Sequence, residues 1–356
     1  MGNIPKNHQL TANIVLLACL CAFGLSATAE SGAAAVRRGD YAAAASRFMA
    51  GAERGDPIAQ NNLGALYLQG RGVVQDYAQA RILFEQAAAG GLAGAMFNLG
   101  IVYLRGYGVS EEIDLANEWF RKAADGGDRE AQFFLGLHLY QGRGTEADIG
   151  AAAILFEQAA AQDLAAAQYN LGVMYLTGEG VEQNDARALG LLERAAEQGN
   201  EQAEMTVAKL DLASTDDPER SQRGFDTFKR LAEAGNADAQ VTLGLLYTFG
   251  QTATHDPEEG RFWLKVASNQ GSGAAQLNLG NIYAEGIGVE RDLVTAYAWY
   301  SISAVTGEPV AAEARDSVAK ELDEAELARG DLLAGELANA LPTRDVGEDA
   351  KPPITP

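Results

Sequence analysis

The chain has 356 residues, with 49 Asp and Glu against 27 Lys and Arg, and its formal net charge at pH 7 is −22. This excess of carboxylates repels the phosphates of nucleic acids and the headgroups of anionic membranes, so the composition excludes nucleic acid as a partner. We interpret the charge as serving solubility, with selection of a basic partner as the alternative.

Residues 1–29 have the layout of a secretory signal peptide. They contain Lys6 and no acid, an apolar stretch over residues 14–25, and Ala-Thr-Ala at 27–29. An apolar run of about 12 residues is shorter than the roughly 20 that cross a bilayer as a helix, so we expect no stable membrane span. We predict cleavage after Ala29, which gives a periplasmic or secreted protein.

Lipid attachment at Cys19 is the alternative for this segment, because residues 16–19 (Leu-Leu-Ala-Cys) vaguely resemble a lipoprotein cleavage box. We disfavour it because the apolar run before the cysteine is short. Cys19 and Cys21 are the two cysteines of the chain, and both precede the predicted cleavage point. The mature protein would therefore form no disulfide and have no Cys-ligated metal.

The rest of the chain repeats with a period of 36 residues. An alanine recurs at this spacing, at Ala59, Ala95, Ala131, Ala167, Ala203, Ala239, Ala275 and Ala311. Four positions later most repeats have a Leu-Gly step, as at Leu99-Gly100, and a pair of glycines follows, as at Gly106 and Gly108. A small residue kept at one place indicates a close contact there.

The second half of each repeat tends to begin with Asp, as at Asp76, whose carboxylate can accept hydrogen bonds from the first turn of a helix. Apolar residues then recur at helical spacing, and a glycine such as Gly91 ends the helix. Each repeat is therefore predicted to be a helix hairpin. It has about 12 residues of helix A, a glycine turn and about 14 residues of helix B.

One hairpin cannot bury its apolar faces alone, so neighbouring hairpins must stack into an all-α, α/α solenoid. At Gly100 the absence of a side chain would let an aromatic ring of an adjoining helix lie almost on the backbone. Glycine costs up to about 1 kcal/mol of helix propensity, which this packing must offset.

Residues 203–238 keep the length of the repeat but lose the Leu-Gly step and both turn glycines. They form either a repeat that has drifted and still stacks, which we favour, or a hinge near residue 210. At the end of the array, residues 323–326 (Asp-Glu-Ala-Glu) resemble a capping box, followed by a helix with Leu327, Leu332, Leu333 and Leu337.

These features divide the chain into a signal peptide (1–29), an N-terminal capping partial repeat (30–58), four well-matched repeats (59–202), a degenerate repeat (203–238), two further repeats (239–310), C-terminal capping helices (311–341) and a disordered tail (342–356).

The phrase A-x-x-x-L-G-x-x-Y-x-x-G-x-G-V, followed by an Asp-led helix ending in A-A-x-x-G, resembles the Sel-one-like repeat, a relative of the tetratricopeptide repeat. Residues 59–202 match it closely, as in AQYNLGVMYLTGEGVEQNDARALGLLERAAEQGN. The resemblance implies a right-handed α/α solenoid with a concave groove. It also implies a role as an adaptor of protein complexes, in bacteria often at the cell envelope, in signalling or exopolysaccharide export.

The glycine pair at Gly106 and Gly108 is predicted to be a turn and not a nucleotide-binding loop. A dinucleotide loop needs a third glycine and a P-loop needs Gly-Lys-Ser/Thr, and the segments GYGVSE, GRGVVQ and GEGVEQ contain neither. His138 and His255 lie in separate repeats without an HxxxH spacing, and no G-x-S-x-G motif occurs. We therefore predict no catalytic residue, no metal site and no cofactor.

His138 stands where other repeats have Leu, Val, Met or Ile, so we expect it to be at least partly buried, with a pH-responsive role as the alternative.

One set of aromatic residues is a candidate binding site. Phe97, Phe133 and Tyr169 occupy one place in three successive repeats, and Asn98, Phe134 and Asn170 follow them. Aromatic side chains roughly 10 Å apart along helices A could hold an extended peptide or sugar chain. Ordinary packing between hairpins is the alternative.

From these observations we predict a non-enzymatic scaffold or regulatory adaptor in the bacterial cell envelope that binds a protein or peptide along the concave groove. The alternative is a protein that binds cell-wall material or another envelope polysaccharide, or an accessory of an enzyme acting on it. That alternative needs a cluster of polar groups that the sequence does not reveal.

Overall fold

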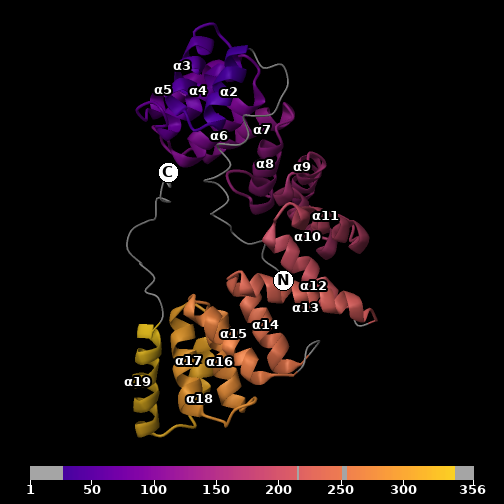
Figure 1. The fold of residues 1–356 in the computed structure, drawn as a ribbon, viewed down its shortest axis with the longest axis vertical. Helices are drawn as coiled ribbons and strands as arrows, with labels where there is room; N and C mark the ends of the chain where they lie inside the picture. The colour runs from indigo at the N-terminus through magenta and orange to yellow at the C-terminus, as the bar shows by residue number, and fades with distance from the viewer. Residues whose placement is uncertain (1–26, 215, 251–254, 341–356) are drawn as a thin grey trace. The chain divides into compact units, whose positions relative to one another are not determined.

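The computed structural model describes residues 27–214, 216–250 and 255–340, which form eighteen α-helices and no β-strand (Figure 1). The helices are α2 (Ala27–Arg37), α3 (Tyr41–Ala52), α4 (Pro57–Gln69), α5 (Tyr77–Ala89), α6 (Ala93–Arg105), α7 (Ile113–Asp125), α8 (Arg129–Gln141), α9 (Ile149–Ala161), α10 (Ala165–Thr177), α11 (Asp185–Glu197), α12 (Glu201–Leu212), α13 (Pro218–Glu233), α14 (Ala237–Phe249), α15 (Pro257–Asn269), α16 (Gly273–Glu285), α17 (Leu293–Val305), α18 (Ala311–Ala319) and α19 (Glu324–Ala340). No helix among these residues is both long and apolar enough to cross a membrane.

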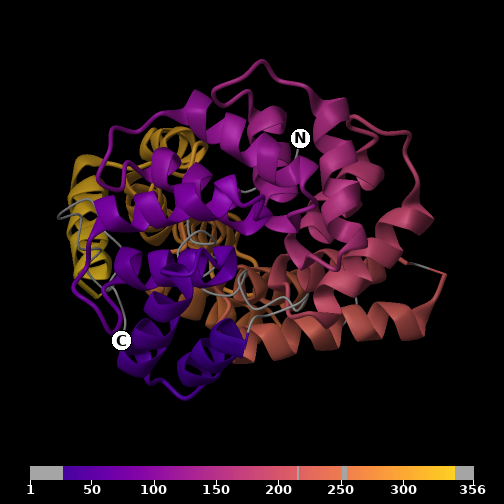
Figure 2. The same cartoon turned by 90° about the horizontal axis from the view of Figure 1, so that it is seen from above.

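Contacts divide the chain into two compact units, residues 1–203 and 204–356. In the first unit, each hairpin pairs helix A with helix B, as in α6 with α7 and α8 with α9. Helix B also contacts helix A of the following hairpin, as α7 contacts α8 (Figure 1 and Figure 2). The predicted α/α solenoid of 36-residue hairpins is confirmed.

The predicted turn chemistry sets the ends of both helices in a hairpin. Asp76 begins α5 by accepting a hydrogen bond from the amide of Gln79, and Gly106 ends α6 in the left-handed conformation at φ 64°. The side chains of Asp40, Asp148, Asp256 and Asp292 cap other helices B in the same way. Both α6 and α7 have 13 residues, close to the expected lengths.

The glycine of the Leu-Gly step receives a large side chain of helix B. A Cβ atom added at Gly136 would lie 2.8 Å from the ring of Phe156, which is fully buried. The same contact occurs in five other hairpins, between Gly64 and Phe84, Gly100 and Phe120, Gly172 and Leu192, Gly244 and Leu264, and Gly280 and Tyr300. The close contact expected from the sequence at Gly100 is therefore present in six hairpins.

The second glycine of the turn serves the neighbouring hairpin. Gly108 has φ 69°, and a Cβ atom added there would lie 2.8 Å from the Cβ of Tyr77, the first residue of the preceding helix B. The Tyr77 ring stacks on Tyr107 with ring centroids 5.2 Å apart. The glycine pair thus ends one helix and leaves room for the preceding hairpin, as its interpretation as a turn requires.

The N-terminal hairpin is formed by α2 and α3. Gly32 of α2 lies against the ring of Phe48, the same contact that the other hairpins make. Ala29, which precedes the predicted cleavage point, is buried within α2. Residues 1–26 of the predicted signal peptide, and all of the predicted disordered tail at 342–356, lie outside the described residues.

In the second unit, the degenerate repeat still contains two helices, which approach each other closely through a different contact. Ala208 replaces the usual glycine of helix A, and a Cβ atom added at Gly224 of α13 would lie 2.6 Å from the Ala208 carbonyl oxygen. An ion pair joins Arg220 to Asp211, and another joins Arg230 to Glu204. The glycine has moved to the opposite helix, so α12 and α13 still approach closely. The boundary between the units falls inside α12, and a hinge there stays a prediction.

The last helix begins with the capping box that the sequence predicts. The Asp323 amide donates to Glu326 Oε2 at 2.9 Å, and the Glu326 amide donates to Asp323 Oδ1 at 2.8 Å. The helix, α19, packs on α17, with Gly330 against the ring of Tyr297. Leu332, expected to share the apolar face of this helix, is instead 67% exposed. It lies about 200° around the helix from Gly330, on the side away from α17.

We predict opposite effects for two glycine substitutions within the first unit. Gly136→Ala should lower the free energy of unfolding by about 1 to 3 kcal/mol, because the new methyl group overlaps the Phe156 ring. Gly190→Ala in α11 should raise it by roughly 0.5 to 1 kcal/mol, because nothing lies within 4 Å of the added atom and alanine favours the helix. Denaturant unfolding followed by circular dichroism measures both. Equal tolerance of the two substitutions would show that the ring does not need the glycine.

Candidate interaction surface

The six residues of the predicted site lie on helices A of three successive hairpins, α6, α8 and α10. Tyr169 is half-buried, and the other five are buried, namely Phe97, Asn98, Phe133, Phe134 and Asn170. The structure therefore brings the set together, but largely inside the stacked helices. A direct contact of the five buried side chains with a partner would require the hairpins to separate. A role of the six residues in binding stays a prediction.

The phenylalanines of this set contact one another and the ring-bearing positions of helices B. Phe97 lies 5.5 Å from Phe134 between ring centroids and 5.7 Å from Phe120. Phe133 lies 5.8 Å from Phe156. Such offset and edge-on arrangements stabilise a core beyond the area that they bury. In this structure the aromatic residues connect neighbouring hairpins, as the packing alternative expects.

The asparagines of the set also bond within the array. Asn98 Nδ2 donates to Asn61 Oδ1 of the preceding hairpin at 2.8 Å. Asn170 Nδ2 donates to the carbonyl oxygen of Ala166 at 3.0 Å, while its buried Oδ1 has no hydrogen-bond partner. The Asn98–Asn61 bond thus joins two helices A, whereas the Asn170 amide bonds within its own helix.

The accessible part of helices A lies nearer to their C-terminal ends. We define the helix-A surface as the exposed Arg105, Gln141 and Thr177, one at the end of each helix, together with the half-buried Leu137 and Val173. Each of these residues lies three or seven positions after Asn98, Phe134 or Asn170. They therefore lie on the same face of helix A as those three residues of the predicted site. That spacing is the signal by which the sequence could have revealed them.

Acidic turns follow directly after the helix-A surface. The acids of these turns are Glu111 and Glu112, Glu146 and Asp148, and Glu179 and Glu182. The Tyr140 hydroxyl donates to Glu179 Oε2 at 2.7 Å, and burial together with Glu179 raises the pKa of Tyr140 to about 12. The surface therefore combines apolar and amide groups with a negatively charged border.

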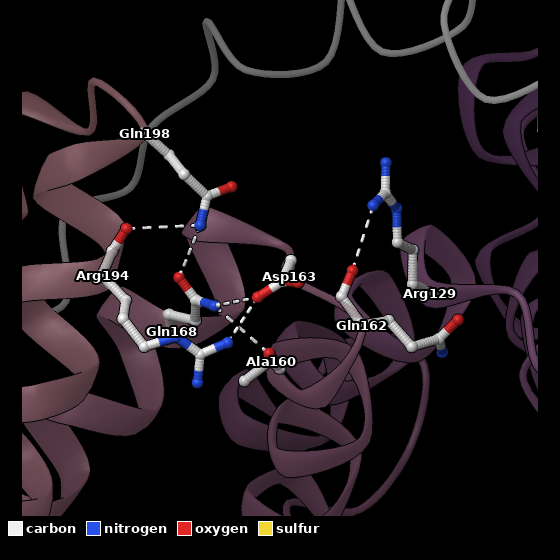
Figure 3. A network of polar contacts seen from close by, with 7 residues as sticks. All are labelled: Arg129, Ala160, Gln162, Asp163, Gln168, Arg194 and Gln198. Carbon is white, nitrogen blue, oxygen red and sulfur yellow. Dashed lines mark hydrogen bonds and ion pairs between the residues drawn. The ribbon is translucent and has the colours of Figure 1, made fainter.

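At the opposite ends of the helices, glutamines join consecutive hairpins (Figure 3). Gln168 Nε2 donates to the Ala160 carbonyl of the preceding helix B at 3.2 Å, and its Oε1 accepts from Gln198 Nε2 at 2.8 Å. Gln132 with Gln162 and Gln240 with Gln270 repeat the side-chain pair. One buried glutamine thus bonds to two helices B, a role that the sequence analysis missed. In the sequence this role is indicated by pairs of glutamines that stand 30 positions apart in several repeats.

Asp163 occupies a link position where the neighbouring repeats have Gly127 and Gly199. Its φ is 59°, a conformation that non-glycine residues rarely adopt. Its carboxylate accepts from Gln168 Nε2 at 3.3 Å and forms an ion pair with Arg194 (Figure 3). These bonds offset part of the cost of the backbone conformation, which is about 1 to 2 kcal/mol for such a residue.

His138 is buried, 4% exposed, and bonds through Nδ1 to Asn117 Oδ1. Asn117 Nδ2 in turn donates to the carbonyl oxygens of Arg143 and Gly144 in the following turn, at 2.9 and 3.0 Å. Burial, and secondarily the charge of Arg143, lowers the pKa of His138 to about 4. The imidazole is therefore neutral at pH 7 and connects α8 to α7 and to the turn.

The residues in the described ranges contain no group of three or more His, Cys, Asp or Glu that could hold a metal ion.

A model of the Sel1 repeat matches six segments, residues 57–92, 93–128, 129–164, 165–200, 237–272 and 273–304, which together make up more than half of the chain. The gap between the fourth and fifth segments contains α12 and α13. No curated protein matches the chain.

The solved structures to which the chain is similar include two that are more than a quarter identical to it over the aligned residues. One is c5321, a protective antigen present in uropathogenic Escherichia coli strains displaying an SLR fold, with 26% identity over 91% of this chain and 81% of that chain and a TM-score of 0.58. The other is a Sel1 repeat protein from Oxalobacter formigenes, with 29% identity over 68% of this chain and 97% of that chain and a TM-score of 0.58.

The histidine predicts a pH dependence of stability. Its pKa in the folded chain, about 4, is below the ordinary value of 6.5, so the unfolded chain takes up a proton first as the pH falls. Between pH 7 and pH 5 this should remove about 2 kcal/mol of stability. The double variant His138→Leu/Asn117→Ala, which has the side chains that other hairpins carry at these places, should lose about 2 kcal/mol less over the same range. Unfolding of the two proteins at each pH measures the difference.

Partial burial raises the pKa of Asp128 to about 6, so protonation of this carboxyl stabilises the folded chain as the pH falls, the opposite of the effect of His138. Because Asp128 is present in both proteins, its contribution cancels in the comparison. An equal loss of stability in both proteins would assign the pH dependence to other groups.

Proposed function

The chain belongs to the Sel1 repeat family, and on that premise we propose that it is a non-enzymatic scaffold or regulatory adaptor that binds a protein or peptide in the bacterial cell envelope. Proteins of this family typically mediate protein–protein interactions. The described residues of this chain present repeated surfaces and rigid hairpins, which suit the binding of an extended partner.

The helix-A surface is the observation that carries the proposal. Equivalent residues are accessible at intervals of 36 positions on the helices A of three successive hairpins, at Arg105, Gln141 and Thr177. Stacked helices lie 8 to 10 Å apart, which is roughly the length of three residues in an extended chain. An extended segment could therefore meet one of these residues about every third position, with Leu137 and Val173 supplying apolar contact between them.

Location in the envelope is the less direct part of the proposal. It is supported by the signal-peptide layout of residues 1–29. The similar protein from uropathogenic Escherichia coli is described as a protective antigen, which agrees with an exported protein.

The binding test compares two triple variants with matched changes of charge. Arg105→Glu/Gln141→Glu/Thr177→Glu alters the helix-A surface, and Arg121→Glu/Gln158→Glu/Ala186→Glu makes the same changes on exposed positions of helices B. We expect capture from envelope extracts, followed by mass spectrometry and titration of the captured protein, to show binding at least about tenfold weaker for the first variant only.

Equal losses in both variants, or none in either, would contradict binding at the helix-A surface. Capture of polysaccharide without protein by the unmodified chain would instead favour the glycan-binding alternative.

The location test measures the mass of the mature protein isolated from the envelope fraction. We expect an N-terminus at Glu30, because the Ala-Thr-Ala segment at 27–29 is suited to a signal peptidase. An acylated N-terminus at Cys19 would show a lipid-anchored form, and an intact N-terminus in the cytoplasmic fraction would contradict export.

A further inference from the structure

The outer face of α19 carries an uncharged stripe that no element of the described ranges covers. The residues of this α19 outer stripe, each three or four positions after the last, are Ala325, Ala328, Leu332, Gly335 and Asn339, and all are exposed. Leu332 at its centre is 67% exposed, and nothing lies within 4 Å of a Cβ atom added at Gly335. The opposite face, with Gly330, lies against α17. The helix thus has two uncharged sides, one of which packs on α17, while the other, with Leu332 at its centre, is exposed among the described residues.

The geometry points to a second copy of this chain as the occupant: we propose that two chains associate through antiparallel contact of their α19 outer stripes. In an antiparallel pair centred on Leu332, a residue three positions before the centre faces the residue three positions after it in the other copy. Gly335 then lies beside Ala328 of the second copy, and because neither has a long side chain the two helices can approach closely on that flank.

Charge complementarity favours this antiparallel arrangement. The pairing brings Arg329 beside Glu336 of the second copy, and twofold symmetry makes the same contact twice. Both residues are exposed, and the 3.7 Å ion pair of Arg329 with Glu326 is itself open to solvent, so it contributes little and can be exchanged. A parallel pair in register would place Arg329 at the level of Arg329 and Glu336 at the level of Glu336, so it would not bring charges of opposite sign together.

The expected association is weak. A helix of 17 residues is about 26 Å long, and one helix pair buries less than the roughly 1,200 Å² of a standard interface. Each chain has a formal charge of −22, so the two copies also repel each other. At about 0.15 M salt this repulsion is screened beyond roughly 8 Å, whereas the stripe contact is not. We expect a dissociation constant of about 10 to 100 μM under these conditions.

The test is sedimentation equilibrium of the full mature chain in about 0.15 M salt, at concentrations from about 1 μM to 1 mM, which bracket the expected constant. The unmodified chain should form dimers. Leu332→Asp should weaken association at least about tenfold, because it places two carboxylates at the centre of the contact. Ile154→Asp is the matched control, since Ile154 is a similarly exposed apolar residue, 59% exposed, on α9, and it should leave association unchanged.

The charge pair is tested separately. Arg329→Glu and Glu336→Arg should each weaken the dimer, and the double variant Arg329→Glu/Glu336→Arg should restore it, an outcome that damage to α19 cannot produce. Gly335→Gln adds a side chain in open space on one chain and should also weaken the dimer, with helix content by circular dichroism unchanged. A monomer at every concentration, or a dimer that withstands Leu332→Asp, would overturn the proposal. A failure of the double variant to restore association would overturn the antiparallel register.

Discussion

The contact between a residue of helix A that lacks a side chain and a large side chain of helix B holds each hairpin together. The Phe156 ring lies over Gly136, where even a methyl group would be too close. Because the ring sits on the backbone, the two helices approach closely and bury their small residues, as the complete burial of Ala131 and Ala152 shows. In the degenerate repeat Ala208 stands in place of the helix-A glycine, and Gly224 of helix B lies against the Ala208 carbonyl oxygen and Leu212, so these two helices approach closely through a different contact.

Stacking of the hairpins then decides which polar groups are buried. A helix A lies between two helices B, so its polar residues either find partners within the array or remain unsatisfied. Gln168 bonds to both neighbouring helices B, and His138 reaches Asn117 and stays neutral. The consequence for function is that most of helix A is interior structure. The accessible residues, such as Gln141, lie toward its C-terminal end, beside acidic turns.

Much of the fold could be predicted from the sequence because the signals that define a hairpin are local. Asp76 caps its own helix, Gly106 ends the helix that precedes it, and the 36-residue period fixes where each recurs. The candidate site stays a prediction. The structure buries Phe97, and the periodicity that identified this residue is produced equally by packing and by binding.

The sequence by itself determined the class of fold, the length of the hairpins, the turns and the capping box at Asp323, since each depends on residues a few positions apart. Only the tertiary structure decided that Phe97 is covered and that Leu332 is not. The physical reason is that exposure depends on which neighbouring helices cover a face. That depends on how hairpins stack and on where α19 lies against α17, and both result from contacts between residues of different helices, such as Phe120 with Phe134 and Tyr297 with Asp331.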